Sequence, residues 1–269
     1  MKFFINRNVP EDVTKLKKLT AVIFALVFAL AATSSARAGD FSGFYIGVNA
    51  GGATSTTNAH TTTVFSPTGY FASSSVPAIA TAGNQTLSTD GFTGGGLAGY
   101  NFQHDHLVIG AEFDYGAMHL SDSATTTANY PCCPGTGFTV NQTLRTRWLF
   151  TARPKVGFAY HQLLIYATGG AARTHVNYFE HFTDTFDTAN ESSFVRQNVT
   201  GWTAGGGVEV RLLHHVSVKG EFLHTDFGDY NNISQNLTAP SNVSWPTSQF
   251  SNHFDLRANV TRIGLNYRF

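Results

Sequence analysis

Apolar and polar residues alternate along eight segments of this chain, and this period of two restricts the possible folds more than any other feature. Within residues 107–118, for example, Phe113 and Tyr115 alternate with Glu112 and Asp114. An extended strand with this pattern has one apolar and one polar face. Helical periodicity does not occur between the segments, so the sequence predicts an all-β fold. The expected strands are 42–53, 91–102, 107–118, 144–158, 163–174, 199–212, 216–227 and 256–269.

The connections between these segments alternate in length. Short connections follow the second, fourth and sixth segments, at Gln103–His106, Ala159–Gln162 and Leu213–His215, and the other four are long and rich in Ser, Thr and Asn. Antiparallel strands joined in this way have all short turns on one rim and all long loops on the other, as outer-membrane barrels do. A β-sandwich would not need this asymmetry. We therefore expect an eight-stranded antiparallel transmembrane β-barrel with short periplasmic turns and long extracellular loops.

The balance of residue types agrees with a lipid-facing exterior. Charged residues make up only 13% of the chain, against roughly 25% in a typical soluble domain. Lys+Arg and Asp+Glu both number 17, and 42% of the residues are hydrophobic. This composition argues against disorder and against a basic nucleic-acid-binding protein.

An apolar run near the N-terminus predicts export. Three lysines precede the run Leu19–Ala32, and an A-x-A cleavage site ends at Ala38, an order typical of secretory signal peptides. The run has about 14 residues, fewer than the roughly 20 that a transmembrane helix needs, which argues against a membrane anchor. We expect a cleaved signal peptide at 1–38 and the barrel domain at 39–269. A translation start downstream of the first Met is an open alternative.

Ionisable side chains fall on the face opposite the apolar one. In a barrel embedded in lipid that face must point into the lumen, because a Lys or Arg on the lipid face costs about 2–4 kcal/mol at the bilayer midplane. Side chains just fill the interior of an eight-stranded barrel, so we expect a buried network of paired charges. Six bases and four acids leave two positive charges in excess, part of which should reach water or another acceptor. The predicted lumen network is Glu112, Asp114, Arg147, Arg153, Lys155, Glu209, Arg211, Lys219, Glu221 and Arg262.

The last predicted strand has an apolar residue at every second position and ends on an aromatic residue. These residues are Ile263, Leu265, Tyr267 and Phe269. The pattern resembles the assembly signal of outer-membrane barrels. The alternative is an ordinary amphipathic strand that happens to end in Phe.

Short stretches along most of the predicted strands are similar to one known family. The chain resembles the small porin-like outer-membrane proteins of alphaproteobacteria, which share the OmpA-type eight-stranded transmembrane barrel. The matching stretches are Gly43–Gly47, Gly99–Phe102, Ile165–Gly170, Gly201–Thr203, Lys219–Leu223, Asp226–Gly228 and Arg262–Phe269.

The resemblance implies an abundant, surface-exposed protein of the cell outer membrane, without a defined chemistry. Some relatives are described as porins and some as haem-binding proteins. The expected partners are outer-membrane lipid and lipopolysaccharide and the barrel assembly machinery, with no nucleic acid. The chain departs from the family in its long Ser/Thr-rich first loop, its paired cysteines and its histidines.

Several residues suggest chemistry, but each has a simpler interpretation. Gly94–Gly99 fits G-x-G-x-x-G, yet the strand pattern continues where a dinucleotide site needs a helix. Cys132 and Cys133 are adjacent in the second long loop, where a local disulfide, intermolecular crosslinking and thiol exchange are alternatives. No nucleophile signature such as G-x-S-x-G occurs.

Eleven histidines are many for a chain so poor in charge. Imidazole can bind transition metals and haem iron, but no H-E-x-x-H or comparable spacing is present. We interpret most of them as solvated turn residues, with a haem or metal role for the outer group as the alternative. The group expected at the periplasmic rim is His104, His106, His161, His214 and His215, and the outer group is His60, His119, His175, His181, His224 and His253.

The sequence therefore predicts a structural, envelope-stabilising barrel of the outer membrane with a plugged lumen, no catalytic activity and no cofactor. One alternative is a narrow porin for small solutes. Another is a receptor that binds haem or an extracellular ligand through the long loops.

Overall fold

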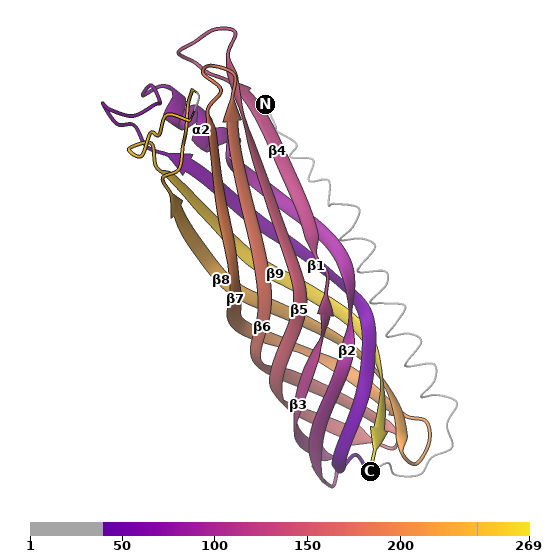
Figure 1. Ribbon diagram of the computed structural model, residues 1–269. Helices are drawn as coiled ribbons and strands as arrows, with labels where there is room; N and C mark the ends of the chain where they lie inside the picture. Colours follow the sequence, from indigo (N-terminus) through magenta and orange to yellow (C-terminus); the bar gives the residue numbers. More distant parts are fainter. Residues whose placement is uncertain (1–39, 241) are drawn as a thin grey trace, which may run out of the picture.

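The computed structural model describes residues 40–240 and 242–269, and the predicted signal peptide at 1–38 lies outside them. The described residues form one tall barrel with a short helix near its upper rim (Figure 1). Within these ranges, no helix has the length and apolar character needed to cross a membrane. The elements are β1 (Gly43–Thr63), α2 (Ser75–Ala82), β2 (Asn84–His104), β3 (Leu107–Met118), β4 (Ser121–Asn129), β5 (Gly137–Tyr160), β6 (Leu163–Asp184), β7 (Asn190–Arg211), β8 (Val216–Ser234) and β9 (Phe250–Arg268).

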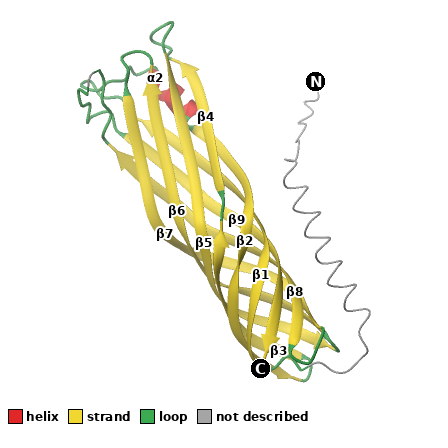
Figure 2. Cartoon of the chain, turned by 45° about the vertical axis from the view of Figure 1, so that its right-hand side comes forward, coloured by secondary structure: helices red, strands yellow, loops and turns green. Residues whose placement is uncertain are grey.

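Antiparallel pairing closes the strands into a ring. The order is β3-β2-β1-β9-β8-β7-β6-β5-β4, and a further pairing of β3 with β5 completes the circle. Both β3 and β4 pair with β5, β3 along Trp148–Phe158 and β4 along Gly137–Arg145. They therefore occupy one position in the wall, interrupted at His119 and Leu120 (Figure 2). The predicted eight-stranded antiparallel barrel is confirmed, with one of its eight wall positions built from two strands.

The predicted short turns join β2 to β3, β5 to β6 and β7 to β8 at one rim (Figure 1). Two of them contain a residue with positive φ, Asp105 at 51° and His161 at 53°. Asp and His enter this left-handed region more readily than most other side chains. This preference accounts for polar residues at these turns.

The long loops are confirmed but are shorter than predicted, because many of the residues assigned to them continue the strands. β5, β6 and β7 contain 24, 22 and 22 residues, whereas a strand needs only roughly 9–11 residues to cross a bilayer. The added length of β1, residues 54–63, is rich in Thr, which fits a pleated wall, and it lacks the apolar alternation on which the prediction rested. The barrel therefore continues far beyond the part that lipid can cover (Figure 1).

The outer and inner faces exchange polarity along the strands. On the outer face of β1, Phe44, Ile46 and Val48 are 44 to 60% exposed near the short turns, whereas Thr56 and Asn58 are exposed farther along. We call the part with the apolar exterior the membrane band and the part above it the extension. Inside the extension lies an apolar core that includes Leu87, Leu144, Val176, Tyr178, Phe254 and Leu256. Apolar side chains thus face outward in the membrane band and inward in the extension.

Aromatic residues mark both edges of the membrane band. Near the short turns, exposed aromatic side chains form a lower aromatic ring of Phe44, Tyr100, Phe102, Phe158, Tyr160, Tyr267 and Phe269. At the other edge, the upper aromatic ring contains Phe92, Tyr115, Trp148, Phe150 and Trp202. Girdles of this kind lie at the two membrane–water interfaces of outer-membrane barrels.

The helix α2 was not predicted. Pro77 is tolerated in its first turn, and the rest of the helix is mostly Ala and Ile. Ile79 is fully buried and joins Phe71, Phe182 and Phe250 in a second apolar cluster. This cluster lies near the upper end of the extension (Figure 1).

Candidate functional site

Acid and base stand directly opposite each other at three places inside the membrane band. Neighbouring strands bring their side chains within reach because the pairing is antiparallel and both residues face the lumen. The three pairs are Glu112 with Arg153, Glu209 with Lys219, and Glu221 with Arg262. The strand register therefore places an acid beside a base on three pairs of neighbouring strands.

Two guanidinium groups link these pairs across the lumen. Arg153 donates from Nη2 to Glu112 Oε1 at 2.9 Å and to Asp114 Oδ2 at 2.8 Å, and from Nη1 to Glu221 Oε1 at 3.1 Å. Arg262 donates from Nε to Glu221 Oε2 at 2.8 Å and from Nη1 to Asp114 Oδ1 at 3.2 Å. Planar guanidinium groups suit such multiple contacts with carboxylates. The two arginines and three carboxylates form one connected cluster.

Two lysines extend the cluster toward the short turns. Lys219 donates from Nζ to Glu112 Oε1 at 2.6 Å. Lys155 donates from Nζ to the Tyr45 hydroxyl at 2.8 Å, and that hydroxyl in turn donates to Glu112 Oε2 at 2.8 Å. Glu112 therefore accepts hydrogen bonds from Arg153, Lys219 and Tyr45.

The periplasmic end of the network reaches the rim through Arg268. Its Nη2 lies 3.3 Å from Glu209 Oε1, and its Nη1 donates to the Asp40 carbonyl at 3.2 Å. Arg211, which is half-buried, donates to the carbonyls of Asp40 and His214 at 2.5 Å each. The positive charges beyond those that the carboxylates balance thus find backbone oxygens at the rim.

Burial of these charges is nearly complete. Arg153, Lys219 and Arg262 expose 1%, 0% and 2% of their surface. Removing one partner of a buried ion pair typically costs about 3–5 kcal/mol, because the other charge is left uncompensated. These side chains therefore pack tightly inside the membrane band and depend on one another for charge compensation.

The lumen prediction is wrong for Arg147, whose side chain is exposed on the outer face of β5. The partners of Thr146 and Leu149 on β6 are Val176 and Thr174, so β5 contains one extra residue between them. A β-bulge of this kind reverses which residues face inward. Arg211 is also outside the ion-paired cluster, at the rim. The structure brings the other eight predicted residues together in the lumen.

Sequence reasoning missed three members of the network. Arg268 lies four residues after Gly264, on the same polar face of the last strand. The alternation of residues therefore could have predicted that its side chain faces the lumen. Tyr45 and Tyr166 look apolar in a binary pattern, but their hydroxyls reach inward. The Tyr166 hydroxyl donates to Glu221 Oε1 at 3.0 Å.

A second buried acidic group lies in the extension. Glu180 of β6 and Glu191 of β7 face inward and expose 0% and 1% of their surface. The Ser234 hydroxyl donates to Glu191 Oε1. Burial and the neighbouring Glu191 carboxyl raise the pKa of Glu180 well above its usual value, so that Glu180 keeps its proton at neutral pH. Sequence reasoning passed over both residues, because the strand predicted at 163–174 ended before Glu180 and the strand predicted at 199–212 began after Glu191.

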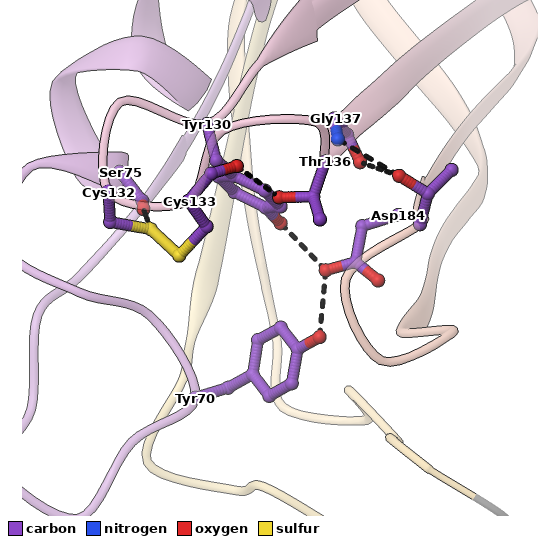
Figure 3. Close-up of a disulfide and its surroundings, with 9 residues drawn as sticks. Tyr70, Ser75, Tyr130, Cys132, Cys133, Thr136, Gly137 and Asp184 are labelled. Atoms are coloured by element: carbon purple, nitrogen blue, oxygen red, sulfur yellow. Dashed lines mark hydrogen bonds between the residues drawn. A yellow bond between two sulfur atoms is a disulfide. The ribbon is translucent and has the colours of Figure 1, made fainter.

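Cys132 and Cys133 are joined by a disulfide in the loop between β4 and β5 (Figure 3). The Ser75 hydroxyl at the start of α2 lies 3.6 Å from the Cys132 sulfur. Close by, the Asp184 carboxylate accepts hydrogen bonds at 2.8 Å from the hydroxyls of Tyr70 and Tyr130 (Figure 3). Burial and these bonds to Asp184 raise the pKa of both phenols. The contacts tie three loops together over the upper end of the barrel.

Several outer histidines pair with asparagines on neighbouring strands. The Nδ1 atom of His175 lies 2.8 Å from Asn198 Oδ1, and that of His224 lies 2.8 Å from Asn259 Oδ1. His181 lies on the same outer face of β6 as His175. Across residues 40–240 and 242–269, no three His, Cys, Asp or Glu side chains gather as a metal-binding group.

The predicted assembly residues lie on the outer face of the last strand. Leu265, Tyr267 and Phe269 are 49%, 47% and 67% exposed, and Ile263 is half-buried. The Phe269 ring contacts the Phe44 ring at a centroid distance of 5.7 Å. The terminal residue thus extends the lower aromatic ring. Its part in assembly stays a prediction.

A closed antiparallel ring with an apolar outer band, two aromatic rings and a charged interior defines an integral β-barrel protein of the outer membrane. The chain belongs to the family described as "Outer membrane protein beta-barrel domain", whose sequence profile matches residues 22–269.

Named relatives agree with this family. The chain is 29% identical over 191 residues to the "31 kDa outer-membrane immunogenic protein" of Brucella melitensis biotype 1, covering 70% of each chain. It is 27% identical over 139 residues to the "22 kDa outer membrane protein" of Rhizobium leguminosarum bv. viciae, covering 52% of this chain and 54% of the relative. These names place the protein in the outer membrane.

Solved structures align less closely. Neisserial surface protein A aligns with a TM-score of 0.37 at 14% identity, over 85% of this chain and 98% of that one. The outer membrane protease OmpT from Escherichia coli aligns with a TM-score of 0.41 at 11% identity, over 89% of this chain and all of that one.

Proposed function

We propose that this protein is a structural component of the outer membrane, a rigid barrel that stabilises the envelope and presents its extension at the cell surface. The observation that carries the proposal is the filled lumen. Arg153 and Arg262 bridge carboxylates from two other strands, β3 and β8, and are almost completely buried. A wall whose inner side chains are cross-linked in this way resists deformation.

Three layers of side chains support a closed lumen. The charged cluster fills the membrane band, the apolar core that includes Leu144 and Phe254 fills the extension, and the cluster around Ile79 covers the upper end. A porin for small solutes would need a water-filled path. The filled interior therefore favours the structural role over the porin alternative. The proposal includes no catalytic step.

Conductance measurements test the closed lumen. The folded protein, reconstituted into planar bilayers, is expected to give no steady conductance, while a known porin in the same bilayers serves as the positive control. Folding is checked by the mobility of unboiled and boiled samples on a detergent gel. Steady open channels from the folded monomer would reject the structural proposal in favour of a porin.

The envelope role has its own test. Cells that lack this protein are expected to lyse at lower detergent concentrations than the parent, and the wild-type chain should restore resistance. The matched comparison is the Arg262→Ala variant, in which the central cross-links are broken. Equal resistance of cells with and without the protein would contradict an envelope-stabilising role.

The receptor alternative is tested by spectral titration with haemin. Binding through the outer histidines would shift the absorption spectrum in the wild type and not in the His175→Ala and His181→Ala variants. The structure favours the other outcome, in which no histidine-dependent shift occurs, because His175 is engaged by Asn198.

A further inference from the structure

A groove of about 680 Å³ lies on the outer face of the barrel, across β4 to β7 at the lower end of the extension. Three arginines from two strands line it together with two asparagines and two phenylalanines. The residues that matter here are Arg145, Arg147, Asn177, Phe179, Phe194 and Arg196. No acidic residue is among those that line the groove.

The strand register sets the spacing of these arginines. Arg145 of β5 stands opposite Asn177 of β6, which stands opposite Arg196 of β7. Adjacent strands are about 4.8 Å apart, so the two arginines of this row start from backbone positions separated by roughly 10 Å. The bulge in β5 turns Arg147 to the same outer face. Three guanidinium groups therefore reach one groove from a fixed framework.

These three guanidinium groups have no carboxylate partner among the described residues. In the described part of the chain, Arg145, Arg147 and Arg196 have no carboxylate within ion-pair distance. By contrast, Arg257 on the outer face lies 3.2 Å from Asp226. The Arg196 guanidinium rests over the Phe194 ring at 4.3 Å, a contact that holds the cation without neutralising it. Although the chain has a formal net charge of zero, this face carries a local excess of positive charge. Such a face attracts anions.

The height of the groove indicates which anions it meets. Trp148 and Phe150 of the upper aromatic ring, three and five residues along β5 from Arg145, begin the membrane band, and Arg173 stands directly opposite Phe150. Aromatic girdles lie at the level of lipid headgroups. Acyl chains that cover the band below would thus continue into headgroups beside the three arginines. Arginine forms bidentate hydrogen bonds with phosphate.

We propose that Arg145, Arg147 and Arg196 form a binding site for a phosphorylated glycolipid of the outer leaflet. The occupant carries phosphate groups on a sugar headgroup that lies in the groove. Two phosphates suit the site, one near Arg145 and Arg147 and the other near Arg196. The acyl chains lie against the apolar wall that includes Phe150, and the Phe179 and Phe194 rings border the sugar from above.

The test uses the full barrel in detergent micelles, with bound lipid measured by native mass spectrometry. The probes are a diphosphorylated glucosamine-disaccharide lipid, its monophosphorylated and unphosphorylated forms, and inorganic phosphate. We expect the affinity to rise with each phosphate on the lipid. The triple variant Arg145→Gln, Arg147→Gln, Arg196→Gln should bind the diphosphorylated lipid at least about 10-fold more weakly, since charge-assisted hydrogen bonds are lost.

The matched control is Arg257→Gln, which removes a guanidinium from the same outer wall but outside the groove. Its lipid affinity should stay within about twofold of wild type. All variants must keep the mobility difference between unboiled and boiled samples, which shows that they are folded. Equal lipid retention by the triple variant and wild type would overturn the proposal. Binding of inorganic phosphate as tight as that of the lipid, or an equal loss in Arg257→Gln, would also overturn it.

Discussion

Arg262 of β9 and Asp114 of β3 meet across the lumen although β1 and β2 lie between their strands. Arg262 Nη1 donates to Asp114 Oδ1 at 3.2 Å and its Nη2 donates to Asp114 Oδ2. Contacts of this kind connect parts of the wall that share no backbone hydrogen bonds. They make the barrel one mechanical unit rather than a chain of strand pairs.

Replacing Arg262 should therefore destabilise the whole barrel. Arg262→Ala leaves Asp114 and Glu221 as buried carboxylates with fewer partners, at a cost of about 3–5 kcal/mol. Arg257→Ala, on the outer face, breaks an ion pair with Asp226 in which the arginine side chain is 54% exposed, and should cost less than about 1 kcal/mol. Urea unfolding in detergent micelles measures both changes. A similar loss in the two variants would contradict the cross-linking role of Arg262.

The protonated Glu180 carboxyl predicts how stability changes with pH. Its pKa is raised above the unfolded value of about 4.5, so the folded chain holds a proton that the unfolded chain releases. The stabilisation from this proton is complete below about pH 4.5 and is lost as the pH rises, with a slope of at most about 1.4 kcal/mol per pH unit. Urea midpoints at pH 5 and pH 9 should differ less in Glu180→Gln than in the wild type. The same difference in both proteins would show that Glu180 does not set the pH dependence.

Neighbouring glycines of β2 are expected to respond differently to substitution. A Cβ on Gly95 would lie 2.3 Å from the Tyr115 carbonyl oxygen, whereas on Gly96 its nearest neighbour, the Gly47 carbonyl oxygen, is 3.8 Å away. Gly95→Ala should cost about 1–3 kcal/mol through overpacking of the wall, and Gly96→Ala should be nearly neutral. Thermal unfolding, followed by gel mobility, compares the two. A tolerated Gly95→Ala would mean that the β2–β3 contact is looser than it appears.

The terminal residue should matter for assembly more than for stability. Deleting Phe269 removes the last aromatic group of the outward pattern and should lower the amount of barrel in the outer membrane. Phe44→Ala removes the ring that Phe269 contacts but keeps the terminus, and it should assemble normally. The amount of folded protein in membrane fractions, compared between the Phe269 deletion and Phe44→Ala, measures the effect on assembly. Unchanged levels after deletion of Phe269 would reject the assembly signal.

The alternation of apolar residues was sufficient to predict the ring and most of the charged lumen. Glu112, Arg153 and Glu221 were placed correctly because an unbroken pleat keeps every second side chain on one face. Arg147 was misplaced because a single extra residue in β5 reverses that order. No composition rule marks the bulge, which is visible only in the pairing of β5 with β6.

The extension escaped prediction for a different physical reason. Its outer positions, such as Thr56 and Asn58, face water, and its inner positions include small residues such as Ala53 and Ala59. In this part of β1, neither side carries the large apolar residues that mark a strand in lipid. Glu180 escaped because the strand predicted at 163–174 ended before it, although Val176, Tyr178 and Phe182 continue the inward apolar alternation of β6.

The exchange of polarity along each strand also fixes the vertical position of the barrel. A shift toward the periplasm would pull threonines and asparagines into hydrocarbon, and a shift outward would expose the upper aromatic ring to water. The residues of the wall thus set the level at which the barrel meets water, and the extension projects from the membrane by a constant height.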